Sequence, residues 1–507
     1  MKSRKTLINV TVSSIYQIVT IICGLITPRL LLMAFGSTYY GAFSSVGQFL
    51  GIISALSMGI PGASRLELYK LLSISDNEGI SKVVKATQKY SKKVSVIIIF
   101  YAALLCLLYP YISNSDLLFA ENAIIIVIVA LGLFIEYFFG MAYYNVIDAD
   151  QKQYIRFALR IFATIANTLV VVLLIRLGYN VFTVKLASSM VFAITPFFVY
   201  LYVKNTYHID NSVETDMSVI PERKNVLIHA ISAFVYEHVD VFVLTIFLDV
   251  KYVAIYTIYH TIIHYLRLLL EIFTGDLESV FGTLWANKER DRVDSLFSGY
   301  ETFSFMFICV VFSCAGLLIM PFVALYTAGV HDINYYHVDI GILIVLSEAL
   351  YCIRDPYRIL IQATGSYEQT KVGVIMEAAT NAILSVVLTA YLGFNGVLVG
   401  TVVSTLITII QFSWFSDVKL LNRKYVIFFK RLIWTVITMA LVVGVCSALK
   451  LGNVERINNW GNWILDGLGV FLISASMTVI STIIFYRKDL YVILDKVKVA
   501  LFAQNKS

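Results

Sequence analysis

Long apolar runs separated by short polar connections make up most of this chain. Each run is long enough to cross the ~30 Å hydrocarbon core of a bilayer, which takes about 20 helical residues. The runs cover 7-33, 40-68, 94-112, 118-146, 157-177, 181-203, 226-248, 252-282, 300-326, 338-362, 371-392, 394-416, 428-449 and 463-486. The pattern predicts an all-α polytopic membrane protein with about fourteen transmembrane helices.

The composition supports this prediction. Hydrophobic residues make up 59% of the chain and charged residues only 14%, and the mean hydropathy is +0.80. Soluble proteins average about 25% charged residues. The first apolar run follows Lys2, Arg4 and Lys5, but it is too long for a signal peptide and no small-residue cleavage site follows it. We therefore expect it to be a retained span.

Lys and Arg residues are distributed unevenly between alternate connections. Of the 39, six lie on the side opposite the amino terminus, and Arg267 lies within a span. The six are Arg29, Arg176, Lys185, Lys251, Lys450 and Arg456. The positive-inside rule then places both termini in the cytoplasm. The net charge of +6 reflects this topology, so no nucleic-acid partner is expected, and the basic run from Lys82 to Lys93 is expected to contact anionic membrane lipids.

The two halves of the chain align at a nearly constant offset of 213 to 215 residues. The matching segments are Tyr39 to Ser44 with Tyr252 to Thr257, Asn167 with Asn381, and Leu177 to Asn180 with Leu392 to Asn395. Six helices per copy make the copies parallel, an arrangement found in transporters whose substrate site lies between two lobes. The predicted parts are a six-helix lobe over 1-205, a cytoplasmic linker over 206-225, a second six-helix lobe over 226-416, and two further helices with a cytoplasmic tail over 417-507.

Ionisable residues gather on the two neighbouring predicted helices 226-248 and 252-282. In the second helix, four residues recur every three or four positions and share a stripe about 60° wide. They are His260, His264, Arg267 and Glu271. The first helix carries Glu237, His238 and Asp240, near the predicted midplane. Ionisable groups in a bilayer are costly and usually face a cavity or a partner.

We expect this set to line a hydrophilic cavity. His260, His264 and Arg267 would bind an anionic group of the substrate. Charge balance or proton coupling would fall to Glu237, His238, Asp240 and Glu271. The alternative is that these residues only neutralise one another as contacts between helices.

Two further arginines are candidates for substrate binding. Arg29 follows Pro28 toward the outer end of the first span, from where it could reach the cavity or the membrane interface. Arg65 ends the second span together with Glu67, at a cavity mouth or as a membrane anchor.

The remaining charged residues of the spans predict structural roles. We expect Glu136, Glu348 and Glu377 each to be paired with another residue of the protein. By contrast, Arg354, Asp355 and Arg358 near an inner helix end are expected to be solvated.

Neither a cofactor nor a metal is predicted from the sequence. No Gly-x-x-x-x-Gly-Lys-Ser/Thr phosphate-binding loop occurs. The six cysteines lie within predicted helices without metal-ligand spacing and are expected to be packing residues. The spacing of His331, Asp332, His337 and Asp339 on one outer loop fits no usual ligand set.

The first 70 residues resemble the amino-terminal signature of polysaccharide flippases, which belong to the multidrug/oligosaccharidyl-lipid/polysaccharide exporter superfamily. The segments that carry the resemblance are Pro28 to Leu32, Phe35-Gly36, Tyr40 to Ser45, Gln48 to Gly51 and Gly59 to Ala63. Elsewhere the resemblance lies in the two-lobe plan. It implies a flippase that moves undecaprenyl-pyrophosphate-linked oligosaccharide repeat units from the inner to the outer leaflet of the bacterial cytoplasmic membrane, for O-antigen, capsule or exopolysaccharide assembly. A lipid-linked oligosaccharide would be the partner, with the polysaccharide polymerase machinery as a further one.

Three other functions remain open at this point. Lipid II flippases, another branch of the superfamily, similarly use arginines in the cavity and remain possible, although no segment of this chain points to them in particular. A cation-coupled drug or metabolite antiporter of the same fold is disfavoured because such transporters usually need a carboxylate in the first helices, where this chain has Arg29. A membrane enzyme of glycan assembly is disfavoured because the outer connections are too short to build an acceptor site. We therefore expect no enzymatic activity.

Overall fold

Each predicted span overlaps a helix, and the described part of the chain contains no strand. The computed structural model describes residues 2–57, 59–74, 76–207, 209–210, 213, 224–274 and 277–491. Among these residues, 11 helical stretches are long and apolar enough to cross a membrane. The all-α, multi-pass membrane fold predicted from the sequence is confirmed.

The chain divides into two compact units. Unit 1 comprises Met1–Ile258 and Gly329–Ile333, and unit 2 comprises Tyr259–Ala328 and Asn334–Ser507. Much of the predicted linker 206-225 lies outside the described residues. The predicted repeat and its lobe boundaries stay predictions.

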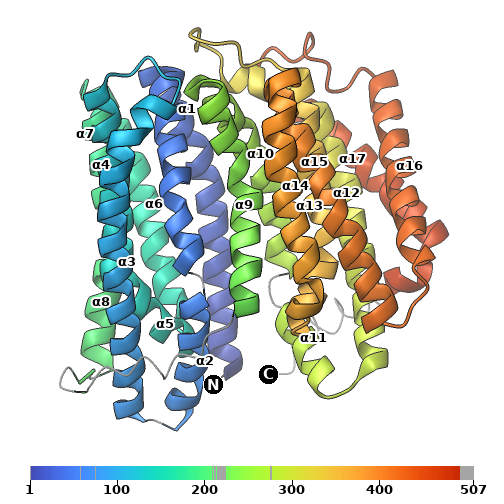
Figure 1. Ribbon diagram of the computed structural model, residues 1–507. Coiled ribbons are helices and arrows are strands. Elements are labelled where there is room, and N and C mark those ends of the chain that lie inside the picture. The colour runs from blue at the N-terminus through green and yellow to red at the C-terminus, as the bar shows by residue number, and fades with distance from the viewer. Residues whose placement is uncertain are drawn as a thin grey trace. The chain divides into compact units, whose positions relative to one another are not determined.

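Unit 1 is a bundle of long helices with short connections (Figure 1). Its elements are α1 (Lys2–Ser57), α2 (Gly59–Ser73), α3 (Asn77–Ile112), α4 (Phe119–Ile135), the π-helical turn η1 (Glu136–Gly140), α5 (Met141–Ala149), α6 (Gln153–Arg176), α7 (Val181–Phe192), α8 (Ile194–Thr206) and α9 (Lys224–Phe247). Helix α1 packs on α6 and α9, and α3 packs on α4. Fully buried apolar side chains from α1 and α4, including Val46, Leu50 and Ile125, form the core between them.

Helix α1 contains the first predicted span, 7-33, and most of the second, 40-68, whose last part lies in α2; Gly36 separates the two spans. This glycine has φ 79° and ψ 175°, which breaks the helix within the gap predicted between 33 and 40. Asp332 then caps the second half of α1. Its carboxylate accepts hydrogen bonds from the Ser37 backbone N–H at 2.6 Å and the Ser37 hydroxyl at 2.8 Å, because a new helix start leaves backbone donors unsatisfied. This cap attaches residues 329–333 to unit 1.

Unit 2 is also entirely helical in its described part. Helix α10 (Val250–Thr274) begins in unit 1 and continues into unit 2 from Tyr259. The other elements are α11 (Leu277–Ala286), α12 (Arg290–Tyr326), α13 (Val338–Ala363), α14 (Tyr367–Leu392), α15 (Phe394–Trp414), the π-helical turn η3 (Phe415–Leu420), α16 (Val426–Ala448) and α17 (Trp460–Phe485). Helix α13 packs on α11, α12 and α15, and α12 packs on α16 and α17.

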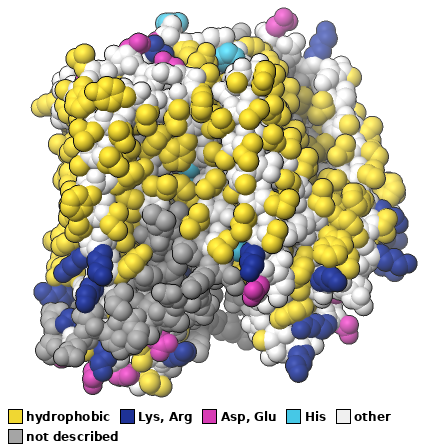
Figure 2. All heavy atoms as spheres, in the orientation of Figure 1, with side chains coloured by type: hydrophobic (Ala, Val, Ile, Leu, Met, Phe, Trp, Pro, Cys, Tyr) yellow, Lys and Arg dark blue, Asp and Glu magenta, His cyan; other side chains and the backbone are white. Residues whose placement is uncertain are grey.

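The outer surfaces of the helices are apolar, as a lipid environment requires. Phe100 and Leu107 on α3 and Ile437 on α16 are exposed, and hydrophobic side chains cover much of the face drawn in Figure 2.

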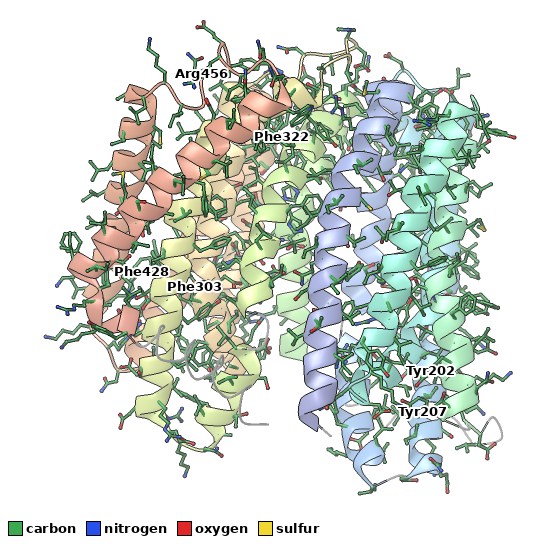
Figure 3. All side chains as sticks on the ribbon, turned by 180° about the vertical axis from the view of Figure 1, so that it is seen from behind. Tyr202, Tyr207, Phe303, Phe322, Phe428 and Arg456 are labelled. Carbon is green, nitrogen blue, oxygen red and sulfur yellow. The ribbon has the colours of Figure 1, made fainter. Side chains whose placement is uncertain are left out.

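Aromatic side chains gather near helix ends, as is typical of membrane interfaces. Tyr202 and Tyr207 lie at the end of α8 (Figure 3). The Tyr207 hydroxyl donates to Asp150 at 2.5 Å, and burial together with this hydrogen bond raises the pKa of Tyr207 above its usual value. This contact holds the end of α8 against the turn between α5 and α6.

Candidate functional site

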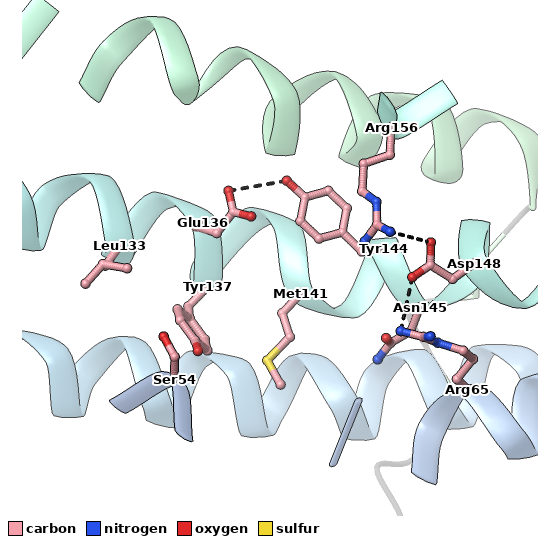
Figure 4. A pocket seen from close by; sticks show the side chains of 10 residues that line it. All are labelled: Ser54, Arg65, Leu133, Glu136, Tyr137, Met141, Tyr144, Asn145, Asp148 and Arg156. Carbon is pink, nitrogen blue, oxygen red and sulfur yellow. Dashed lines mark hydrogen bonds and ion pairs between the residues drawn. The ribbon is translucent and has the colours of Figure 1, made fainter. Parts of the chain in front are cut away.

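Unit 1 contains a cavity of about 350 Å³ with a polar lining (Figure 4). Its walls come from α1, α2, α6 and the continuous segment formed by α4, η1 and α5. The π-helical turn η1 carries Glu136 and Tyr137, which both line the cavity. Single π-helical turns inside α-helices are frequent at functional sites. Sequence periodicity did not predict this turn, because a period of 3.6 residues contains no signal for it.

Two arginines share one carboxylate in this cavity. Arg65 Nη2 on α2 lies 3.1 Å from Asp148 Oδ2 on α5, and Arg156 Nη2 on α6 lies 3.1 Å from Asp148 Oδ1. Asp148 is buried, whereas 38% of the Arg65 side chain is exposed. A buried carboxylate is costly to desolvate, so it needs these partners. Arg65, by contrast, retains access to the cavity and to solvent.

A second ion pair continues the polar lining. Arg160 Nη2 lies 2.8 Å from Glu136 Oε1, and the Tyr144 hydroxyl donates to Glu136 Oε2 at 3.3 Å. Tyr144 also lies beneath the Arg156 guanidinium, with 5.4 Å between the guanidinium carbon and the ring centre. The lining of this cavity contains two arginines, Arg65 and Arg156, and two carboxylates, Glu136 and Asp148. Arg160 pairs with Glu136 from a neighbouring cavity.

Among the described residues, three buried polar atoms of the cavity lining have no hydrogen-bond partner. They are the donors Arg65 Nε and Asn145 Nδ2 and the acceptor Asp148 Oδ1. An unsatisfied buried donor costs about 1–3 kcal/mol, so a bound group with acceptor oxygens would stabilise the two donors. A phosphate group fits this requirement, because guanidinium groups bind its oxygens bidentately.

Unit 2 brings the predicted stripe on α10 against Glu348 on α13. His260 Nε2 lies 3.2 Å from Glu348 Oε1, and Arg267 Nη1 lies 3.4 Å from Glu348 Oε2. The rings of His260 and His264 stack at 5.7 Å between centres. Glu271 lies one turn further along α10, 3.8 Å from Arg267 Nε. All four predicted stripe residues thus lie in one cluster.

Arginines and carboxylates continue from this cluster along α13. The guanidinium carbons of Arg267 and Arg354 lie 4.1 Å and 4.5 Å from the centre of the Tyr351 ring. Arg354 in turn lies 2.5 Å from Glu377 on α14. Each buried arginine therefore has a carboxylate partner and an aromatic face. In this cluster, two arginines face three carboxylates, Glu271, Glu348 and Glu377.

The other predicted site residues lie in unit 1. Arg29 is half-buried in α1, and Glu237 is exposed on α9. The ring centres of His238 and Phe234 lie 4.2 Å apart, and Asp240 accepts a hydrogen bond from the Tyr256 hydroxyl at 3.2 Å. The roles assigned to these residues stay predictions.

The predictions for the other charged residues had mixed outcomes. Glu136, Glu348 and Glu377 are each paired with an arginine, as predicted. The prediction that Arg354 and Asp355 are solvated was wrong, because both are buried. Arg354 binds Glu377, and Asp355 accepts hydrogen bonds from Arg358 Nε at 2.9 Å and from Tyr300 at 3.2 Å.

Asp148, Asn145 and Arg156 were missed as site residues. Asp148 and Arg156 are eight positions apart on either side of the turn between α5 and α6, and Arg65 lies far away in sequence. The only available signal was a carboxylate at the end of an apolar run. The convergence of the two arginines on it depends on the packing of α2 and α6 against α5.

No family model and no curated protein matches this chain. Solved structures do match. A lipid II flippase MurJ in an inward closed conformation has a TM-score of 0.68 at 14% identity, over 94% of this chain and 98% of that one. An inward-facing multidrug resistance MATE family transporter of the MOP superfamily has a TM-score of 0.60 at 17% identity, over 78% of this chain and 93% of that one. This chain therefore has the fold shared by these two transporters, over nearly the whole length of each.

Proposed function

We propose that this protein is a flippase that moves undecaprenyl-pyrophosphate-linked oligosaccharide repeat units from the inner to the outer leaflet by alternating access. The product would serve O-antigen, capsule or exopolysaccharide assembly. The observation that carries the proposal is the unit 1 cavity, where Arg65 and Arg156 share Asp148 while Arg65 Nε and Asn145 Nδ2 lack acceptors. The likeness to a lipid II flippase over 94% of the chain supports it.

The cavity geometry supports a mechanism of anion exchange. In the substrate-free state, the single carboxylate of Asp148 pairs with both Arg65 and Arg156. An entering pyrophosphate competes with Asp148 for the two guanidinium groups and satisfies the unpartnered donors. Its release returns both arginines to Asp148, so the carboxylate limits how tightly the anion is held. Binding that is too tight would slow release on the other side.

The unit 2 cluster consists of His260, His264, Arg267 and Glu271 on α10 and Glu348 on α13. In this proposal it contacts the anionic group and balances charge or couples transport to protons. Glu348 is shared between Arg267 and His260. A change in the charge or position of one of these side chains therefore alters the contact of Glu348 with the other. We retain Arg29, His260, His264 and Arg267 as proposed contacts of the anionic group. Glu237, His238, Asp240 and Glu271 are retained for charge balance or proton coupling.

The proposed location is the bacterial cytoplasmic membrane, with both termini in the cytoplasm. Membrane lipids and the lipid-linked oligosaccharide would be partners, and the polymerase machinery a further one. The fold is that of the two transporters above, and the outer connections are short, so we propose no enzymatic activity.

A drug or metabolite antiporter is the second candidate function. The MATE likeness and the two carboxylates near the unit 1 cavity, Glu136 and Asp148, favour it. The convergence of Arg65 and Arg156 on one carboxylate opposes it, because the two guanidinium groups would repel an organic cation. Uptake of a cationic dye distinguishes the two functions.

The test is surface glycan display in cells that lack the chromosomal copy of the gene and carry a plasmid-borne variant. We expect Arg65→Ala with Arg156→Ala to abolish display while the protein remains in the membrane. Arg292→Ala is the control, because its side chain is 76% exposed. Normal display in the double variant would rule out the proposed anion site. Unchanged display after complete deletion, together with increased dye sensitivity, would favour the antiporter.

A further inference from the structure

Three potential metal ligands converge in unit 2. His260 and His264 lie one turn apart on α10, and Glu348 faces them from α13. One ligand atom from each of the three residues lies within 4.8 Å of the other two. Two histidines at positions i and i+4 on one helical face form a recurrent zinc-binding arrangement, to which another element adds the third ligand.

The distances fit a tetrahedral ion. With metal–ligand bonds of about 2.1 Å, neighbouring ligand atoms of a tetrahedral zinc site lie about 3.4 Å apart. His260 Nε2 and Glu348 Oε1 are already 3.2 Å apart. The site therefore requires only that the His264 ring approach the other two ligands, without movement of a helix.

The hydrogen bonding around the three residues also fits. His264 Nδ1 is buried and has no hydrogen-bond partner among the described residues, so in the tautomer protonated at Nε2 it offers a lone pair to an ion. Arg267 binds the other oxygen of Glu348, Oε2, at 3.4 Å. Ligating carboxylates are typically held by such an outer partner, which orients the ligand without competing for the same oxygen. About a third of the His260 side chain is exposed, which leaves room for an entering ion and a fourth ligand.

We propose that His260, His264 and Glu348 bind a divalent transition metal ion of the Zn²⁺ type. Two imidazoles and one carboxylate suit zinc, cobalt or nickel, whereas Mg²⁺ and Ca²⁺ prefer oxygen ligands alone. The bound ion joins α10 to α13 within unit 2. His260 and His264 are also retained above as proposed contacts of the anionic group, so metal binding is measured without lipid-linked substrate, and its failure would leave the unit 1 cavity proposal intact.

The test is zinc binding by the full-length protein, purified in detergent without a histidine tag and stripped of metal with a chelator. Zn²⁺ is titrated against a zinc-sensitive dye. We expect saturable binding that weakens at least tenfold in His264→Ala and persists in a large excess of Mg²⁺. His331→Ala is the matched control, because His331 is exposed and lies outside the cluster. Gel filtration of each variant verifies that it is folded.

A second measurement does not depend on any variant. Co²⁺ added to the wild-type protein should give the intense visible absorption bands of tetrahedral coordination, and Zn²⁺ should displace them. Equal zinc affinity in the wild type and a folded His264→Ala variant would overturn the proposal. The absence of tetrahedral Co²⁺ bands in the wild type would overturn it as well.

Discussion

Arg65 and Asp148 form an ion pair of 3.1 Å that joins α2 to α5 beside the unit 1 cavity. The carboxylate also binds Arg156 from α6, so one buried carboxylate links side chains of α2, α5 and α6. Asp148 is buried, whereas both arginines keep exposed surface. Under the proposed function, this asymmetry would let the guanidinium groups exchange a fixed protein carboxylate for a mobile anion.

Asp148→Asn should tighten binding of a pyrophosphate-linked lipid. The substitution keeps the shape of the side chain but removes the charge that competes for Arg65 and Arg156. We expect an affinity increase of about tenfold, corresponding to roughly 1.4 kcal/mol, measured by titration of undecaprenyl pyrophosphate in detergent. The transport rate should fall, because release becomes slower. An unchanged or weaker affinity would show that Asp148 does not compete with the anion.

Arg267→Ala and Glu237→Ala should each abolish surface glycan while the protein remains in the membrane. Arg267 is the cation at the centre of the unit 2 cluster, and Glu237 is the carboxylate predicted to balance charge near the midplane. Immunoblots of membrane fractions verify the protein level, and glycan staining measures function. Normal glycan in both variants would refute the predicted cavity roles of these residues.

Removal of one partner from the Arg267–Glu348 pair should destabilise unit 2 more than removal of both. Glu348→Met alone leaves the buried Arg267 guanidinium with Glu271 at 3.8 Å, which costs up to roughly 3–5 kcal/mol, whereas apolar replacement of a whole buried pair is often nearly neutral. Thermal unfolding in detergent without metal should therefore show a larger loss for Glu348→Met than for Arg267→Met with Glu348→Met. If the double variant unfolds at a lower temperature than Glu348→Met, the loss of stability does not come from an unpaired Arg267.

Glu301 is expected to be a stability determinant of unit 2. This fully buried carboxylate lies 3.2 Å from Arg423 and 3.1 Å from Arg431, and Tyr357 donates to it. Glu301→Ala should cost roughly 3–5 kcal/mol, because two buried arginines lose a shared partner. Glu289→Ala is the control, since its exposed partner Arg292 makes the pair worth about 0–1 kcal/mol. Similar thermal stabilities for the two variants would contradict this role.

Gly396→Ala should disrupt the packing of α15 against α14. A Cβ at Gly396 would lie 2.3 Å from the Leu388 backbone, which cannot move aside easily. Gly47→Ala is the matched control, because a Cβ there meets nothing within 4 Å. We expect loss of folded protein in gel filtration for the first variant and wild-type behaviour for the second. Equal tolerance would indicate that α15 can shift relative to α14.

The helices were predictable because the membrane imposes their length and composition. The break at Gly36 was also predicted, since polar residues interrupt the apolar run there. The capping of Ser37 by Asp332 could not be predicted, because the two residues are nearly 300 positions apart. The π-helical turn at Glu136 leaves no periodic signal either.

The site was predictable only in part. Periodicity placed His260, His264, Arg267 and Glu271 on one face of a helix, and the structure gathers them. Their partner Glu348 was expected to be paired, but the sequence does not say with which residue. Pairing across helices depends on how α10 and α13 pack, and this packing cannot be derived from a single sequence. For the same reason, Arg354 was expected to be solvated although it is buried against Tyr351 and Glu377.

The flippase assignment is tested most directly by transport in proteoliposomes. A fluorescent undecaprenyl-pyrophosphate-linked oligosaccharide is placed in both leaflets, and the fraction accessible to a membrane-impermeant quencher is followed over time. We predict that the wild-type protein moves label between leaflets well above the rate of protein-free liposomes, and that Arg65→Ala with Arg156→Ala returns the rate to that of protein-free liposomes. A wild-type rate equal to that of protein-free liposomes would contradict the assignment.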